Sequence, residues 1–130
     1  MKSWIPLLFL IFLCIGCENE KEPEASMEFK TGASYASQDT TISMGSSLTV
    51  GIVADKAENN FKAYNVSVSY DGAFNTITIQ NFSIASDENA HYDKDVNLTV
   101  RNLPGIEKYY FTIEDVDGNL LQKMLSFTIE

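Results

Sequence analysis

Apolar and small polar residues alternate along most of the chain after Met27. The alternation is clearest in six runs: 48–54, 66–70, 76–79, 96–100, 109–113 and 125–129. A period of two places one kind of side chain on each face of a strand, so these runs predict strands with one buried and one hydrated face. No stretch has a sustained helical period, although residues 54–61 have room for one helical turn.

Short turn-forming sequences separate the runs, at 44–46, 71–72, 87–89, 103–105 and 117–119. A first strand is expected around Met27 to Thr31, continued near Thr40 to Ser43, which brings the count to about seven. Short strands at regular spacing are typical of a two-layer β-sandwich. We therefore expect residues 27–130 to form an all-β domain, a single sandwich of about seven antiparallel strands.

The expected core collects the apolar positions of these runs. It comprises Phe29, Leu48, Val50, Ile52, Val66, Val68, Ile77, Ile79, Leu98, Val100, Tyr109, Phe111, Ile113, Leu125, Phe127 and Ile129. The chain has two cysteines, Cys14 and Cys17, and both lie near the N-terminus. No disulfide is therefore expected inside the domain, and apolar burial has to supply its stability.

The N-terminal residues have the pattern of an export signal. Lys2 supplies a positive start, and Trp4 to Ile15 form an apolar stretch of signal-peptide length, too short to span a membrane. The pair Gly16-Cys17 then resembles the end of a bacterial lipoprotein signal, although Cys14 stands where most lipoproteins carry Leu. The resemblance implies that residues 1–16 are removed and that Cys17 is lipidated; ordinary signal cleavage and an uncleaved anchor are the alternatives.

Residues 17–26 read as an acidic, disordered tether. Glu18 to Ser26 contains four glutamates and no large apolar residue, so it cannot bury enough surface to offset its ordering entropy. Glu18, Glu20 and Glu22 resemble the acidic signal that sends Bacteroidota lipoproteins to the outer face of the outer membrane. We therefore expect a lipid-anchored, surface-exposed protein; a solvated linker on a periplasmic protein is the alternative.

The C-terminal hairpin resembles the last two strands of PKD-like and other immunoglobulin-like domains. The resemblance is carried by Tyr109 to Asn119 and by Leu125 to Ile129. The segments 32–42 and 45–54 are similar to the opening of small immunoglobulin-like lipoproteins of Bacteroidota. The resemblance implies that Tyr109 acts as a corner tyrosine whose hydroxyl bonds back to the preceding loop. Phe111 occupies the position of the core cysteine in antibody domains.

The charge excludes one class of partner. The chain has 18 acidic and 9 basic residues, a formal net charge of −9, and its lysines and arginine are scattered. Nucleic-acid binding requires clustered cations, so we expect none. The membrane is expected as a partner only through the anchor at Cys17.

The sequence offers little to an enzyme. His91 is the only histidine and lies in a polar segment, so neither a Ser-His-Asp nor a Cys-His site can be assembled. Asp115 and Asp117 have a spacing that two-carboxylate hydrolysis tolerates, but they flank a tight turn. We expect no catalytic residues and no activity.

Calcium is the one cofactor that the sequence raises. Asp115, Asp117 and Asn119 place several oxygen ligands close together, as hard cations require. Gly118 comes too early for an EF-hand, and the closing bidentate glutamate is missing. The favoured interpretation is a hairpin turn in which Gly118 or Asn119 supplies positive φ.

Two further features concern sugars. The segment Asp39-Thr40-Thr41 resembles an O-glycosylation acceptor of Bacteroidota, with Thr40 modified. Four tyrosines could stack on a sugar ring, although tyrosines near strand ends are more often half-buried packing residues. They are Tyr35, Tyr64, Tyr92 and Tyr110.

These observations predict a membrane-anchored, non-enzymatic lipoprotein. Its domain would serve adhesion, recognition or accessory binding of a protein or glycan at the cell envelope, through residues that the sequence leaves unknown. The alternatives are a structural envelope lipoprotein, a small subunit of a larger outer-membrane complex, and a glycan-binding surface protein. An exposed apolar patch would favour a protein partner, and a concave face with tyrosines and carboxamides would favour sugar.

Overall fold

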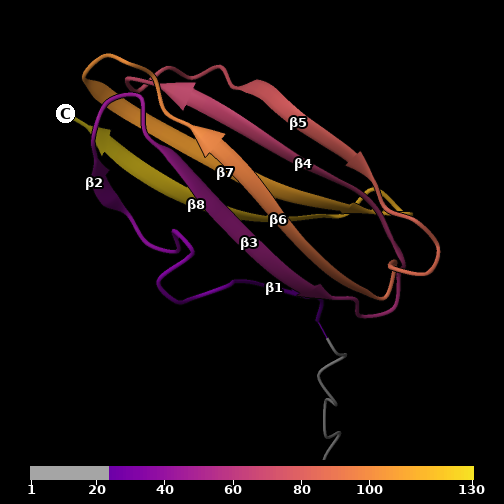
Figure 1. Ribbon diagram of the computed structural model, residues 1–130. Coiled ribbons are helices and arrows are strands. Elements are labelled where there is room, and N and C mark those ends of the chain that lie inside the picture. Colours follow the sequence, from indigo (N-terminus) through magenta and orange to yellow (C-terminus); the bar gives the residue numbers. More distant parts are fainter. Residues whose placement is uncertain (1–23) are drawn as a thin grey trace, which may run out of the picture.

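The computed structural model describes residues 24–130, which form two β-sheets packed face to face (Figure 1). Eight strands follow one another along the chain: β1 (Ser26–Phe29), β2 (Thr40–Ile42), β3 (Ser47–Asp55), β4 (Phe61–Tyr70), β5 (Ile77–Ser83), β6 (His91–Thr99), β7 (Gly105–Asp115) and β8 (Leu120–Ile129). The described residues contain no helix, and hence none that is long and apolar enough to cross a membrane. The expected all-β sandwich is confirmed.

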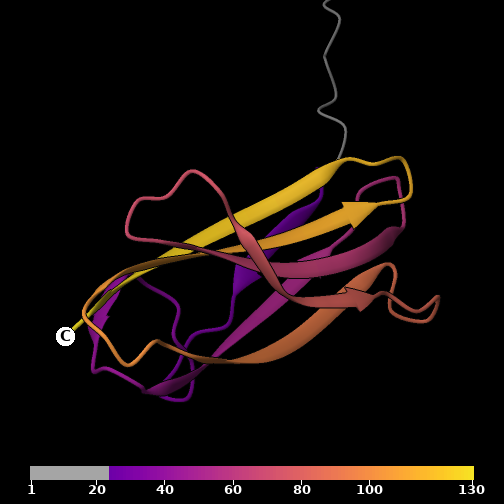
Figure 2. The same ribbon diagram turned by 90° about the horizontal axis from the view of Figure 1, so that it is seen from above.

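The two sheets differ in size. One has three strands in the order β1-β3-β6, and the other has five in the order β2-β8-β7-β4-β5. All neighbouring strands are antiparallel except β2 and β8, which pair in parallel. Figure 2 shows the two sheets as two layers.

The expected single first strand divides into two. Ser26 to Phe29 pairs with β3, whereas Thr40 to Ile42 pairs with β8 in the other sheet. Gly32, with a φ of 120°, lies in the connecting segment that lets the chain change sheets. The strand count is therefore eight instead of about seven, and β1 begins at Ser26, one residue before the expected start of the domain. No helical turn forms between Ala54 and Phe61.

The core lies between the layers and is rich in aromatic contacts. Phe29 meets Phe111 edge to face at 5.4 Å between ring centroids, and Tyr64 meets Tyr92 at 5.6 Å. Most predicted core residues are buried, and Phe29 and Leu48 are partly buried. The pattern missed six buried residues: Met27, Ala54, Phe61, Tyr64, Tyr92 and Val96.

Ile77 and Ile79 were expected in the core, but both are exposed. Their side chains retain 57% and 42% of their accessible surface, because β5 is an edge strand of the larger sheet. The pairing of β4 with β5 shifts register between Val66 and Ser67. Such a bulge distorts the pairing of an edge strand, and at this edge the apolar alternation of β5 stays exposed.

Candidate functional site

The outer face of the five-stranded sheet carries the most distinctive surface of the molecule. Successive rows across β4, β7 and β8 place Ser69, Lys108 and Ser126 side by side, then Ser67, Tyr110 and Met124, then Asn65, Thr112 and Gln122. Hydroxyl and carboxamide groups therefore dominate the face, with one aromatic ring and one cation near its middle. Both kinds of neutral polar group donate as well as accept hydrogen bonds.

Three adjoining hollows form a trench over this face. The first, of about 460 Å³, is lined by Lys108, Tyr110 and Phe74, among others. A second of about 440 Å³ shares Tyr110 and Phe74 with it, and a third of about 290 Å³ shares Lys108 and Ser126. From Ile106 to Thr112 the trench follows β7 for roughly 20 Å, at about 3.4 Å per residue. It is long enough for an extended ligand.

A loop forms one wall of the trench. Residues 71–76 connect β4 to β5, and Figure 2 shows this loop standing away from the sheet on its outer side. The chain reverses at Asp71 and Gly72, whose φ angles of 52° and 77° are those that a type I′ turn requires. Phe74 at the loop tip is fully exposed. An aromatic ring held out in this way is available to a ligand.

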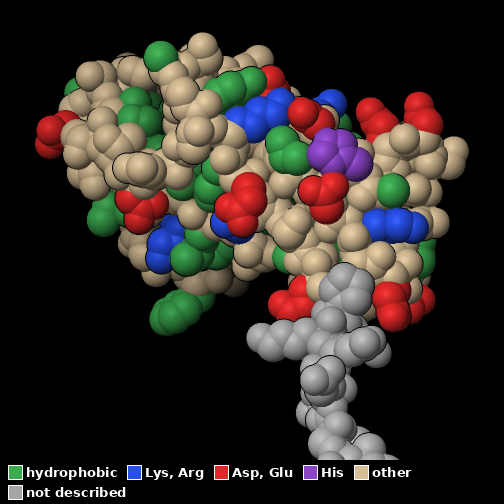
Figure 3. Space-filling model, turned by 90° about the horizontal axis from the view of Figure 1, so that it is seen from below, with side chains coloured by type: hydrophobic (Ala, Val, Ile, Leu, Met, Phe, Trp, Pro, Cys, Tyr) green, Lys and Arg blue, Asp and Glu red, His purple; other side chains and the backbone are tan. Residues whose placement is uncertain are grey.

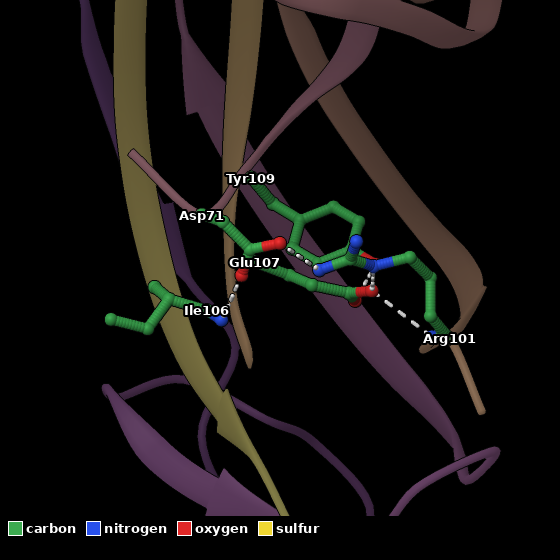
Figure 4. Close-up of polar contacts among 5 residues, drawn as sticks. All are labelled: Asp71, Arg101, Ile106, Glu107 and Tyr109. Carbon is green, nitrogen blue, oxygen red and sulfur yellow. Dashed lines mark hydrogen bonds and ion pairs between the residues drawn. The ribbon is translucent and has the colours of Figure 1, made fainter. Parts of the chain in front are cut away.

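A network of polar contacts fixes the base of that loop (Figure 4). Asp71 Oδ1 accepts a hydrogen bond from the backbone N–H of Ile106 at 2.8 Å, and Asp71 Oδ2 lies 3.2 Å from a terminal nitrogen of Arg101. Arg101 Nε in turn donates to Glu107 Oε1 at 2.8 Å, and the Tyr109 hydroxyl donates to Glu107 Oε2 at 2.8 Å. The loop is thus anchored to the strand that forms the trench floor.

The contacts within this network shift the pKa values of Asp71 and Tyr109. The backbone N–H of Ile106 and then the guanidinium of Arg101 lower the pKa of Asp71 below its usual value of 3.8. Burial, followed by the hydrogen bond to Glu107, raises the pKa of Tyr109 well above its usual range. Asp71 is therefore an anion and Tyr109 a neutral donor at neutral pH.

The expected role of Tyr109 is modified by this network. Its hydroxyl does point back along the chain, but the acceptor is the carboxylate of Glu107 instead of a loop backbone group. Glu107 Oε1 also accepts the backbone N–H of Arg101 at 3.0 Å, so the carboxylate links the tyrosine to the preceding loop. Glu107 is completely buried.

The outer face of the smaller sheet is occupied by paired charges. Lys30 bonds to Asp93 and lies 2.8 Å from Asp95, which also accepts the Tyr35 hydroxyl at 3.1 Å. Figure 3 shows the histidine in purple among acidic side chains. It is His91, which lies at the start of β6 with Nδ1 2.6 Å from Asp55 Oδ1. His91 therefore lies in a strand, and it is exposed.

The Asp115 carboxylate is fully engaged in the β7–β8 turn. Its Oδ1 accepts the backbone N–H groups of Asp117 and Asn119, both at 2.9 Å. Its Oδ2 accepts the Asn119 side-chain amide at 2.9 Å and lies 3.4 Å from that of Asn59. Gly118 has the positive φ of 85° expected for the turn. Among residues 24–130 no three His, Cys, Asp or Glu side chains are placed to hold a metal, and calcium binding here stays a prediction.

The remaining predicted sites divide into two groups. Thr40 is exposed at the start of the edge strand β2, and the neighbouring Asp39 accepts the backbone N–H of Ser126 at 2.8 Å. Modification of Thr40 stays a prediction. Cys17, Glu18, Glu20 and Glu22 lie outside the described residues.

The four tyrosines proposed for sugar stacking differ in how much of each is exposed and in what each contacts. Tyr64 and Tyr92 are core residues with 0% and 3% exposure, so neither offers a ring to a ligand. Tyr35 faces the paired charges of the smaller sheet. Only Tyr110 lines the trench.

Sequence reasoning missed Phe74 and Lys108. Phe74 stands in a turn segment without alternation, and Lys108 looked like one of several scattered cations. One signal was present: Lys108 and Tyr110 occupy the polar positions of a strand whose other positions are predicted core. Residues two apart on a strand share a face.

Comparisons with known proteins place the fold. No protein-family model matches the chain, and no curated protein sequence matches it either. Among solved structures, a chain of the complex of Zinc 2-glycoprotein and Prolactin inducible protein from human seminal plasma matches with a TM-score of 0.51. It has 5% identity over 87% of this chain and 99% of that chain.

Two bacterial enzymes contain a similar unit. The alkylpurine DNA glycosylase of Pseudomonas fluorescens, solved bound to DNA, matches with a TM-score of 0.51 and 13% identity over 83% of this chain. A family 123 glycoside hydrolase from Clostridium perfringens matches with a TM-score of 0.51 and 9% identity over 82%. The chain spans only 31% and 27% of these proteins. At such identities the likeness concerns the fold alone: residues 24–130 form an immunoglobulin-like β-sandwich.

Proposed function

We propose that this protein is a membrane-anchored, non-enzymatic recognition module of the cell envelope, and that it binds its partner in the trench of the five-stranded sheet. The observation that carries the proposal is the continuity of the three hollows around Lys108, Tyr110 and Phe74. Concave surfaces with a few convergent polar groups are the usual form of binding sites. The finer resemblance to small lipoproteins of Bacteroidota supports the anchoring by Cys17 and display at the outer membrane.

The position of the tether supports binding away from the membrane. Glu24 and Ala25 line a hollow together with Asp115 and Asn119, so the tether joins the domain at the β7–β8 turn. The loop that carries Phe74 is fixed at the other end of β7, beside Ile106. A ligand can therefore reach the trench from the side that faces away from the anchor.

A small subunit of a larger outer-membrane complex is the second candidate. Four large apolar side chains are exposed along the trench or at its ends: Phe74, Ile106, Leu120 and Met124. Apolar residues exposed on one face are common where proteins associate. Migration of the native detergent-solubilised protein with a partner, instead of alone, would favour this candidate.

Protease shaving of intact cells tests the location. An antibody against residues 27–130 and a periplasmic control protein are followed together. Loss of the domain signal with the control intact is the expected result, and Cys17→Ser should release the protein from the membrane. Protection of the domain would contradict surface display and would direct the search to periplasmic partners.

Cell adhesion tests the binding face. Cells that display the wild-type chain are compared with cells that display Tyr110→Arg on wells coated with mucin, collagen or purified polysaccharides. Wild-type cells should adhere to at least one coating, and Tyr110→Arg should remove that adhesion. Thr49→Arg, on the smaller sheet, is the matched control. Equal adhesion by both variants and the wild type would contradict the proposal.

A further inference from the structure

Lys108 is exceptional among the cations of the described chain. Lys30, Lys62, Arg101 and Lys123 each form an ion pair with a carboxylate. The other two are also engaged: Lys56 donates to Asn60, and Lys94 lies over the Phe82 ring at 4.4 Å. Within residues 24–130, Lys108 alone has neither an ion pair, a side-chain hydrogen bond nor an aromatic ring as partner.

The surroundings of Lys108 are those of an anion subsite. Its neighbours across the sheet on the same face are Ser69 and Ser126, and it lines two of the three hollows. Asp39 is the one carboxylate among the residues that line the three hollows; it shares the smallest hollow with Lys108, and its Oδ1 accepts the backbone N–H of Ser126. An unpaired ammonium group flanked by hydroxyls, in a chain with a net charge of −9, complements a single negative group on a ligand.

The rest of the trench is suited to neutral sugar units. Asn65, Thr112 and Gln122 continue the row of groups that both donate and accept hydrogen bonds, as sugar hydroxyls do. Tyr110 lies between the two larger hollows and offers a half-buried ring with a polar tip. Polyanions such as nucleic acids require several cations, and the trench has one.

A protein partner fits this face less well. Protein interfaces have an apolar centre and a polar rim. Here the rows across β4, β7 and β8 are polar except for Met124, whereas the apolar Phe74 stands on the loop and Leu120 lies at the start of β8.

We propose that the ligand is an oligosaccharide of mainly neutral sugars that carries one acidic group. This inference rests on the binding face proposed above. Lys108 binds the carboxylate or sulfate of that sugar, and Tyr110 stacks against a neighbouring ring. Asn65, Thr112 and Gln122 hydrogen-bond the hydroxyls of the units beyond. Phe74 covers the ligand from the loop.

Matched pairs of oligosaccharides test this assignment. Full-length lipidated protein in detergent micelles is titrated calorimetrically with lacto-N-neotetraose, with its sialylated form and with its sulfated form. Xylo-oligosaccharides with and without one glucuronic acid form the second pair. At least one acidic form should bind tenfold or more tightly than its neutral counterpart, which corresponds to about 1.4 kcal/mol. Comparison of the sialylated and sulfated forms distinguishes a carboxylate from a sulfate.

Variants assign the preference to Lys108. Lys108→Met should remove the tenfold preference for the acidic form, and Lys108→Arg should retain it. Lys94→Met removes one charge from the smaller sheet and should change nothing. Added salt should weaken binding of the acidic form only. Thermal unfolding of each variant verifies that it folds.

Several results would overturn the inference. Equal binding of acidic and neutral forms, or an unchanged preference in Lys108→Met, would show that Lys108 recognises no anion. Binding of no oligosaccharide in the panel would also overturn it. Adhesion to a protein coating that Tyr110→Arg removes would then leave the proposed function standing. Failure of both experiments would reject the trench as a site.

Discussion

Arg101 Nε donates a hydrogen bond to Glu107 Oε1 across 2.8 Å, and no part of the Glu107 side chain is exposed. The guanidinium also lies 4.1 Å from the centre of the Tyr70 ring. A buried carboxylate is costly unless it is paired and its oxygens are satisfied. Here both Glu107 carboxylate oxygens accept hydrogen bonds. Arg101 also donates a hydrogen bond to Asp71, at the base of the loop of residues 71–76. The stability of this end of the sandwich and the position of the candidate site therefore depend on the same contacts.

Two buried tyrosines, Tyr64 and Tyr109, give opposite predictions. The Tyr64 hydroxyl is buried without a hydrogen-bond partner among the described residues, whereas the Tyr109 hydroxyl donates to Glu107. An unsatisfied buried donor costs about 1–3 kcal/mol, so Tyr64→Phe should raise the free energy of unfolding or leave it unchanged. Tyr109→Phe should lower it by about 1–3 kcal/mol. Urea unfolding measures both, and a loss of stability in Tyr64→Phe would contradict the packing described.

Gly105 is required at the start of β7. Its φ is 152°, and a Cβ atom placed there would lie 2.2 Å from Asp71 Oδ1 and 3.2 Å from a terminal nitrogen of Arg101. Gly105→Ala should displace Asp71 from Ile106 and lower the free energy of unfolding by about 1–3 kcal/mol. Gly32→Ala is the matched control, because its φ is also positive but nothing lies within 4 Å. Equal melting temperatures of the two variants would argue against the steric contribution.

Stability should fall in acid through Asp71. Its pKa in the folded protein is lowered, first by the Ile106 N–H and then by Arg101, so its stabilising contribution is present above 3.8. That contribution is lost as the pH falls through the lowered pKa, because the unfolded chain then binds the proton more tightly. The pKa values of Asp95 and Asp115 are lowered as well and act in the same direction. Melting temperatures between about pH 5 and pH 2 measure the fall.

Asp71→Asn identifies the share of the effect that comes from this network. The variant should have a lower melting temperature near neutral pH and a shallower decline in acid. Asp87 is exposed and has no ion pair among residues 24–130. Asp87→Asn should therefore leave the melting temperature near neutral pH and its decline in acid unchanged. An identical decline in wild type and Asp71→Asn would contradict the assignment.

Asp115 should stabilise the β7–β8 turn without a metal. Asp115→Ala removes the acceptor of the Asp117 and Asn119 N–H groups and should lower the free energy of unfolding. Millimolar calcium or a chelator should not shift the melting temperature of the wild type, because the carboxylate oxygens already accept N–H donors. An upward shift with calcium that Asp115→Ala removes would instead establish a metal site.

The alternation of residues was sufficient to predict the sandwich, but it failed on particular strands. Buried apolar positions such as Val50, Val68 and Phe111 follow directly from the period of two. Ile77 and Ile79 have the same period but are exposed, because periodicity does not say whether a strand is central or at an edge. Likewise, no local signal in the sequence shows that Met27 belongs to one sheet and Thr40 to the other.

The residue pattern along the chain was enough to predict the fold class, the turns, most of the core and a strongly acidic chain without clustered cations. The sequence also predicts the anchor at Cys17, because the residues of that signal are neighbours along the chain. Two relationships became visible only in the folded domain: Lys108, Tyr110 and Phe74 line one trench, and Glu107 is the buried partner of Arg101. The physical reason is that a strand pattern specifies which face a side chain occupies. Register, strand order and the pairing of distant charges arise only when the sheets assemble.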